Sequence, residues 1–228
     1  MKKILLFSCL LGLYAACGTK PDQQDAGKPL QPSPLPSSEE TSTKRVILFF
    51  GNSLAAGYGL EESSQAFPGL IQRRIDSIGL PYRVVNAGLS GETSAGGDGR
   101  IEWVLRQPVD VFVLELGAND GLRGIPVEET RKNLQSIIDK VRLQNPDVKL
   151  VMAGMQAPPN MGKDFTDGFR EIYPDLARKN SMALVPFLLE GVAGDSGLNQ
   201  SDGIHPTAEG HRILMENVWK VMSGLLKP

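Results

Sequence analysis

The sequence predicts an α/β protein in which a five-stranded parallel sheet lies between two layers of helices. Short, nearly continuous apolar runs rich in β-branched residues recur along the chain, as in parallel strands that are buried on both faces. Between these runs, apolar residues recur at spacings of three and four, which is the period of an amphipathic helix. This alternation is typical of a three-layer α/β/α sandwich, which binds ligands beyond the carboxyl ends of its strands.

The two patterns assign most of the chain after residue 44, and no internal repeat is present. The predicted strands are 46–50, 83–86, 109–116, 149–153 and 183–185. The predicted helices are 66–78, 100–107, 127–144, 165–179 and 206 to about 225. We expect Pro206 to open the last helix, because a proline is well tolerated at a first helical position.

Residues 1–17 have the pattern of a bacterial export signal. Lys2 and Lys3 form a basic start, and residues 4–13 form an apolar core that is too short to span a bilayer. Small residues precede Cys17, as in a lipobox, so we expect cleavage before Cys17 and diacylation of its sulfur. Tyr14 stands where an aliphatic residue is usual. The alternative is an ordinary cleaved signal that releases a soluble protein.

The rest of the chain divides into a tether and one domain. Residues 18–43 are rich in Pro, Ser, Gln, Asp, Glu and Thr, and so few apolar side chains cannot offset the entropy of ordering. Residues 44–228 have the length and apolar content of a single domain. No cysteine follows Cys17, which excludes disulfides and thiolate metal sites from this domain. The formal net charge is −2 without a basic block in the domain, which argues against nucleic-acid binding.

Candidate site residues follow four of the predicted strands, and the polar ones suggest a serine nucleophile. Ser53 follows the first strand, and Asp202 and His205 follow the fifth. A serine needs a base at neutral pH, and the base needs a partner that orients it. Only two histidines are present, and the other, His211, has Ala208 three positions before it. We therefore predict a Ser53–His205–Asp202 triad and expect His211 to be an ordinary helix residue.

The same edge offers donors for an oxyanion. The backbone N–H groups of Ser53 and Gly88 and the side-chain amide of Asn119 are the candidates, and one such donor typically lowers the barrier by roughly 3 to 4 kcal/mol. Asp120 is interpreted as a side chain that stabilises its loop. The glycine-rich stretch 95–99 lacks the spacing and the lysine of a phosphate-binding loop, so it is expected to be a surface loop or a helix start.

Four segments together resemble the SGNH (GDSL-type) hydrolases. They are Gly51-Asn52-Ser53-Leu54, Gly88, Gly117-Ala118-Asn119-Asp120 and Asp202-Gly203-Ile204-His205-Pro206. The chain is most similar to the thioesterase I, lysophospholipase L1 and arylesterase branch. One residue departs from that branch, which usually carries Asp before the nucleophile, where this chain has Asn52. An amide oxygen can still accept hydrogen bonds there, but the charge is lost and the amide orientation is open.

The resemblance implies the flavodoxin-like SGNH fold and a serine esterase that forms an acyl-enzyme without metal or cofactor. The expected substrates are lysophospholipids or short acyl esters, with thioesters as a side activity, bound in an apolar groove near residues 121–125 and 155–161. The alternative for the methionines of 155–161 is that they pack in the core or the loop. The alternatives are a carbohydrate O-acetyl esterase and a non-catalytic lipoprotein that binds lipid or glycan. With Cys17, the expected location is the cell envelope, anchored by lipid and facing the periplasm or the outer-membrane surface.

Overall fold

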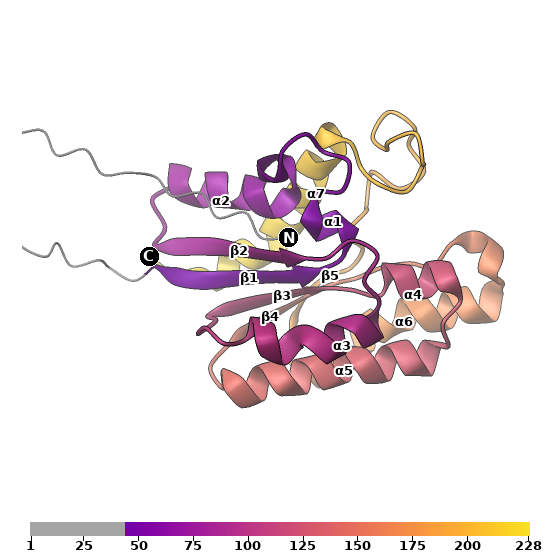
Figure 1. The fold of residues 1–228 in the computed structure, drawn as a ribbon, viewed down its shortest axis with the longest axis horizontal. Coiled ribbons are helices and arrows are strands. Elements are labelled where there is room, and N and C mark those ends of the chain that lie inside the picture. The colour runs from indigo at the N-terminus through magenta and orange to yellow at the C-terminus, as the bar shows by residue number, and fades with distance from the viewer. Residues whose placement is uncertain (1–43) are drawn as a thin grey trace, which may run out of the picture. The chain divides into compact units, whose positions relative to one another are not determined.

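The computed structural model describes residues 44–228, and the predicted signal, Cys17 and tether lie outside the described residues. Within this part of the chain, five parallel strands form one sheet in the order β2-β1-β3-β4-β5 (Figure 1), which confirms the predicted fold class. The strands are β1 (Arg45–Gly51), β2 (Tyr82–Gly88), β3 (Val111–Glu115), β4 (Lys149–Ala153) and β5 (Ala183–Val185).

Helices cover both faces of the sheet. In Figure 1, α1, α2 and α7 lie on one face, α3, α5 and α6 lie on the other, and α4 lies beyond the ends of the strands. Their bounds are α1 (Ser53–Ala56), α2 (Phe67–Ser77), α3 (Ser94–Val104), α4 (Ala118–Arg123), α5 (Val127–Gln144), α6 (Lys163–Lys179) and α7 (Ala208–Met222). Short 3-10 turns are η1 (Ser63–Gln65), η2 (Pro159–Met161) and η3 (Ser223–Leu225).

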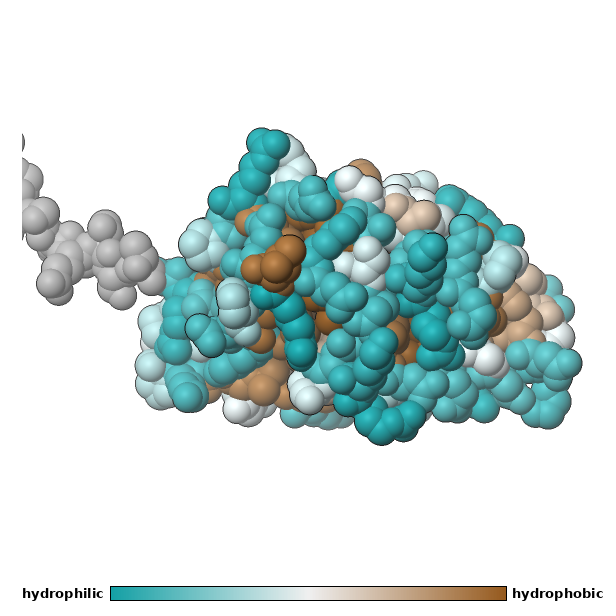
Figure 2. All heavy atoms as spheres, turned by 90° about the horizontal axis from the view of Figure 1, so that it is seen from below, coloured by the Kyte–Doolittle hydropathy of each residue, from teal (hydrophilic) through white to brown (hydrophobic). Residues whose placement is uncertain are grey.

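The core lies on both sides of the inner strands of the sheet. All five side chains of β3 are buried, and β1 is buried from Val46 onward, which explains why both have the pattern of continuous apolar runs. On the outer side of α3 and α5 the surface is mostly hydrophilic, with apolar side chains only in small separate groups (Figure 2). No helix in residues 44–228 is long and apolar enough to cross a membrane.

The topology places a crevice at the ends of β1 and β3. The chain leaves β1 toward β2 on one side and returns to β3 on the other. Such a reversal of strand order leaves room for a ligand beyond the carboxyl ends of the two strands. In register, Gly51 at the end of β1 pairs with Gly88 of β2 and with Glu115 of β3. The loops that carry the predicted site residues therefore start from neighbouring points.

The third helix starts six positions earlier than the predicted 100–107, at Ser94. Thr93 caps it, because its side-chain oxygen accepts the Gly96 N–H. A Cβ on Gly97 would lie 2.4 Å from Leu116 Cδ1, so glycine lets the helix pack closely on the sheet. The stretch 95–99 is thus a helix start, whose glycines hide the apolar period in the sequence.

The last helix starts later than predicted, at Ala208, so the prediction that Pro206 opens it was wrong. Thr207 is the N-cap, and its side-chain oxygen accepts the Gly210 N–H at 3.3 Å. Pro206 instead forms an isolated antiparallel bridge with Asn199. The short helices α1 and α4 were not predicted, because four and six residues are too few to show a period.

Candidate active site

Ser53, His205 and Asp202 form a continuous chain of hydrogen bonds at the carboxyl edge of the sheet. Ser53 Oγ lies 2.9 Å from His205 Nε2, and His205 Nδ1 lies 2.7 Å from Asp202 Oδ2. Ser53 begins α1 directly after β1, and the other two residues lie in the loop between β5 and α7. The structure thus brings together the three residues that the sequence singled out.

Asp202 is held as a carboxylate. Its Oδ1 accepts the backbone N–H groups of His205 at 3.0 Å and Ile204 at 2.9 Å. The bond from the His205 backbone, the bond from the His205 ring and the bond from Ile204 keep the pKa of Asp202 well below its usual range. An ionised carboxylate only accepts, so the bound His205 Nδ1 carries the proton and Nε2 presents a lone pair to Ser53.

Two residues that the sequence analysis missed hold His205 in place. The Tyr58 ring packs against the imidazole, with 4.5 Å between the ring centroids. The Gln200 side-chain amide donates to the Tyr58 carbonyl at 2.7 Å and to the Pro206 carbonyl at 3.0 Å. The Gln200 backbone N–H donates to the His205 carbonyl at 2.7 Å. Gln200 therefore connects the loop that carries His205 to the loop after α1. No motif in the sequence indicated this role of Gln200.

The structure resolves the orientation of the Asn52 amide. Its Oδ1 accepts the Leu54 N–H at 3.0 Å, which caps α1. Its Nδ2 donates to Glu115 Oε1 at 2.8 Å. The neighbour on one side is a donor and the neighbour on the other is an acceptor, so only this amide orientation satisfies both.

The three predicted oxyanion donors differ in the hydrogen bonds that they already make. No residue within 44–228 accepts the Ser53 N–H. Asn119 Nδ2 donates one hydrogen to the Glu92 carbonyl at 2.9 Å and has a second one to give. The Gly88 N–H donates to Asn86 Oδ1 at 3.0 Å. The role of these groups in stabilising an oxyanion remains a prediction.

Gly88 has a packing role that the sequence did not suggest. A Cβ at this position would lie 2.3 Å from the Ala56 backbone nitrogen and 2.8 Å from the Ala55 carbonyl carbon. Glycine therefore lets the end of β2 contact the backbone of α1, whether or not a substrate approaches it. The Asn86 amide strengthens this contact by donating to the Ala55 carbonyl at 2.7 Å.

Asp120 stabilises its loop, as predicted. The side chain is fully buried. One carboxylate oxygen accepts the Ser94 N–H at 2.9 Å, and the other accepts the hydroxyls of Ser94 and, at 3.3 Å, Thr130. These bonds tie α4 to the starts of α3 and α5, and so they fix the helix that carries Asn119.

His211 is a buried residue of α7 and takes no part in the triad. Its Nδ1 accepts the Phe67 N–H at 3.2 Å, at the start of α2. Burial and the positive field of His205 lower the pKa of His211 to about 4, so the ring is neutral at neutral pH. The prediction of an ordinary helix residue is confirmed, and the side chain additionally satisfies an end of a neighbouring helix.

A cavity of about 620 Å³ opens beside Ser53. One wall contains Leu122 and residues 155–159, which the sequence predicted. The opposite wall contains Gly203 and Ile204 of the histidine motif and residues that the sequence analysis missed, namely Phe187, Leu189, Ala193, Gly194 and Asn199. His205 is the only ionisable side chain among the lining residues. The lining of the cavity therefore suits an uncharged part of a substrate.

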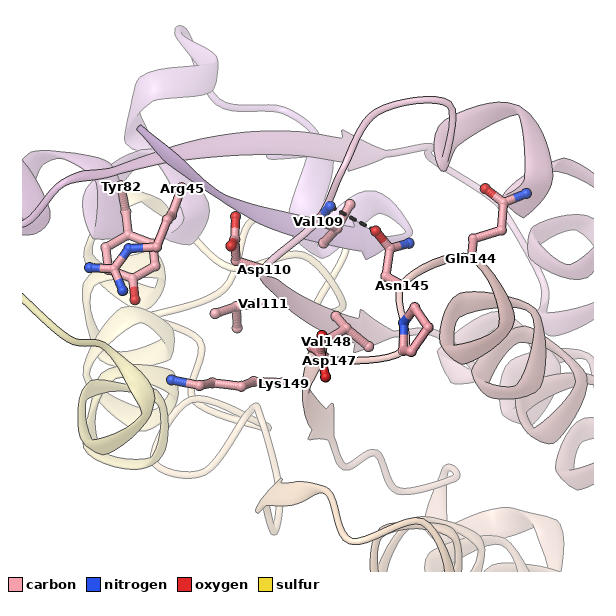
Figure 3. A pocket seen from close by; sticks show the side chains of 11 residues that line it. Arg45, Tyr82, Val109, Asp110, Val111, Gln144, Asn145, Asp147, Val148 and Lys149 are labelled. Carbon is pink, nitrogen blue, oxygen red and sulfur yellow. Dashed lines mark hydrogen bonds between the residues drawn. The ribbon is translucent and has the colours of Figure 1, made fainter. Parts of the chain in front are cut away.

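Another cavity, of about 340 Å³, lies at the opposite edge of the sheet, where the strands begin (Figure 3). Charged side chains of both signs surround it, among them Arg45, Asp110, Asp147 and Lys149. Asn145 Oδ1 accepts the Val109 N–H at 2.9 Å in its wall. None of the predicted site residues lines this cavity, so it is separate from the triad.

Comparison with known proteins places the chain in a family of hydrolases. Residues 49–213 match the GDSL-like Lipase/Acylhydrolase family. Esterase TesA of Pseudomonas aeruginosa is 40% identical over 188 residues, which cover 82% of this chain and 92% of that protein. The thioesterase 1/protease 1/lysophospholipase L1 of Escherichia coli is 35% identical over 182 residues, which cover 79% of this chain and 85% of that protein.

A solved structure of TesA, 42% identical in sequence, superimposes with a TM-score of 0.76 and covers 80% of this chain and 100% of the TesA chain. The family match covers more than half of the chain, and it includes Ser53, Asn119 and His205. The chain therefore belongs to the GDSL-like Lipase/Acylhydrolase family and is a serine hydrolase that acts on ester bonds.

Proposed function

We propose that this protein hydrolyses carboxylic esters of acyl chains, with lysophospholipids and short acyl esters as its main substrates, through the Ser53–His205–Asp202 triad. One observation supports this choice above the others. The bonded pair of Ser53 Oγ and His205 Nε2, 2.9 Å apart, borders a cavity of about 620 Å³ in which no lining side chain other than His205 is ionisable.

The reaction runs in two halves. Ser53 Oγ attacks the carbonyl carbon while His205 Nε2 takes the hydroxyl proton, and Asp202 stabilises the imidazolium. Collapse of the tetrahedral intermediate breaks the ester bond, and His205 returns the proton to the leaving alcohol. A water molecule then attacks the acyl-enzyme by the same route and releases the carboxylic acid. Ser53 N–H and Asn119 Nδ2 are the donors best placed to bind the oxyanion.

The cavity favours an acyl chain over a sugar. Its walls are largely Leu, Ala, Pro, Met and Phe side chains, and an apolar wall gains free energy from burying methylene groups. The hydroxyls of a sugar that faced these apolar side chains would have no partners there. Thioester hydrolysis is proposed as a side activity, because an exported enzyme meets little cytosolic acyl-CoA.

A substrate panel tests the proposal. The purified protein should react with a fluorophosphonate probe and should hydrolyse p-nitrophenyl acyl esters and lysophosphatidylcholine with a higher kcat/KM than acetylated xylan. Ser53→Ala is the matched control, and it should not react with the probe. Preference for acetylated xylan would instead indicate a carbohydrate O-acetyl esterase. A folded wild type that the probe does not label would indicate a non-catalytic binding lipoprotein.

We further propose that a lipid on Cys17 anchors the protein in the cell envelope. The pattern of residues 1–17 supports this location. Residues 18–43 have the composition of a flexible linker, which would separate the lipid from the catalytic domain. The domain would then face the periplasm or the outer-membrane surface.

Cys17→Ser should convert a membrane protein that needs detergent for extraction into a soluble exported one. Its specific activity toward a soluble ester should equal that of the wild type, because the change lies outside the domain that carries the site. Cell fractionation and an ester assay measure the two effects. Membrane association that persists after signal cleavage in the Cys17→Ser protein would contradict the anchor.

A further inference from the structure

A buried carboxylate lies directly behind the nucleophile. Glu115, the last residue of β3, has no exposed surface. It is paired in register with Gly51, and a Cβ on Gly51 would lie 2.3 Å from Glu115 Oε2. The carboxylate therefore fills the space where β1 turns into α1. The catalytic steps described above do not use it.

Three N–H groups of the nucleophile turn, residues 52–55, point at this carboxylate. Glu115 Oε2 accepts the backbone N–H groups of Asn52 at 3.0 Å and Ala55 at 3.1 Å. Glu115 Oε1 accepts Asn52 Nδ2 at 2.8 Å. All three partners are donors, which is the arrangement that an ionised carboxylate requires.

These bonds leave one donor of the turn free. The Leu54 N–H is taken by Asn52 Oδ1, and the Ala56 N–H donates to the Asn52 carbonyl at 3.0 Å. Since Glu115 accepts from Asn52 and Ala55, Ser53 is the only residue of the turn whose N–H has no acceptor within the described part of the chain. That N–H is the one expected to bind the oxyanion.

We propose that Glu115 is a positioning residue for the nucleophile: as a carboxylate it holds the turn 52–55 so that Ser53 Oγ meets His205, and Asn52 is the partner that allows the charge. This inference rests on the proposed esterase function. It assigns no contact between Glu115 and the substrate. Glu115 acts through the orientation of Ser53 Oγ and the Ser53 N–H.

The choice of Asn at position 52 follows from hydrogen-bond matching. Asn52 donates to Glu115 and accepts from Leu54, so one amide serves both neighbours. An aspartate at position 52 could only accept, and it would place a second negative charge against Glu115. Two carboxylates in contact must share a proton, because both cannot stay ionised in a buried site. With Asn52 as its partner, Glu115 can therefore ionise fully without a second carboxylate in contact with it.

Burial, and after it the neighbouring hydrogen bonds and charges, set the pH at which Glu115 ionises. Burial raises the pKa of Glu115 to about 8, against the lowering effect of its three N–H bonds, and the nearby Glu92 also raises it. Glu92 is paired with Arg100. Tyr173, the other titratable group close by, stays neutral because burial and the charges of Asp120 and Glu115 raise its pKa well above 10. The wild-type kcat should therefore rise with pH through about 8.

A double-mutant cycle on positions 52 and 115 tests the proposal. In Glu115→Gln, the new side-chain NH₂ group must point either at the NH₂ group of Asn52 or at the backbone N–H groups of Asn52 and Ala55. In both orientations a donor faces a donor. In Asn52→Asp, two carboxylates meet. In the double variant, the glutamine oxygen at position 115 can accept the two backbone N–H groups while the glutamine NH₂ donates to the aspartate at position 52. The negative charge is then on the residue at position 52, and every donor of the pair again has an acceptor.

The expected results separate positioning from simple packing. Glu115→Gln should lower kcat by about 10-fold to 100-fold with little change in KM, as expected when reacting groups are displaced by up to an ångström. Asn52→Asp should lose kcat as pH rises, because the shared proton leaves the pair, whereas the wild type gains kcat with pH. The double variant should recover kcat to within a few-fold of the wild type and should lack the rise near pH 8.

Val113→Ala is the matched control for lost stability. Val113 lies two residues earlier on the same strand and is equally buried, so its truncation should lower Tm without changing kcat.

Fluorophosphonate labelling of the wild type reports separately on the proposed function. Thermal unfolding of the four proteins of the cycle does not depend on activity, and the double variant should regain the Tm that each single variant loses. The proposal would be overturned by a double variant as impaired in kcat, or as low in Tm, as the worse single variant, or by an unchanged kcat in Glu115→Gln.

Discussion

Ser53→Ala and His205→Ala are each expected to abolish ester hydrolysis while the domain stays folded. Each removes one end of the 2.9 Å contact between Ser53 Oγ and His205 Nε2, without which the hydroxyl is not activated. Knocking out either member of such a unit typically lowers kcat by roughly 10⁴-fold to 10⁶-fold. Steady-state kinetics with p-nitrophenyl esters measure the loss, and circular dichroism confirms the fold.

The double variant Ser53→Ala/His205→Ala should be no worse than either single variant, because the residues act as one unit. A much larger loss in the double variant would mean that they act independently. Asp202→Asn should be comparable or less severe, since the carboxylate orients and stabilises the imidazole. The other histidine provides the control: His211→Gln removes a buried ring that does not line the cavity, so it should affect Tm and leave kcat unchanged.

The sequence predicted the fold because its signals are local. The buried strands 149–153 and 183–185 and the helix 127–144 were predicted with the bounds that the structure shows, since each has a clear apolar pattern. The sheet edge that carries Ser53 and His205 followed from the rule that parallel strands end on one side. The prediction missed α1 and the start of α3, because a very short helix and a glycine-rich one show no apolar period.

The remaining parts of the site depend on contacts between distant segments. Glu115 lies in a run with the pattern of an apolar strand, and only the register between β1 and β3 places it against Asn52. Most of the second wall of the cavity comes from residues 187–199 after β5, where no motif indicates a binding surface. Gly88 was predicted as an oxyanion donor, but the contact that demands a glycine there is with the backbone of α1.

Asn119→Ala is expected to lower kcat by roughly 10²-fold or more with little change in KM, as loss of a donor used only in the transition state implies. The residue lies on α4 beside the cavity. One hydrogen of its amide is held by the Glu92 carbonyl at 2.9 Å, which fixes the group and leaves the second hydrogen for the oxyanion. Such a pre-oriented donor needs no rearrangement during the reaction, which is why its removal is costly.

The control is Asn133→Ala, which removes an amide of α5 that donates to Ser94 Oγ at 3.1 Å and does not line the cavity. It should change Tm without changing kcat. A second comparison uses the charge: Asn119→Asp keeps the size of the side chain but replaces the donor with an acceptor facing the oxyanion, so it should be at least as slow as Asn119→Ala. If Asn119→Ala kept the kcat of the wild type, Asn119 would be a residue of the loop only, and Ser53 N–H would have to bind the oxyanion without it.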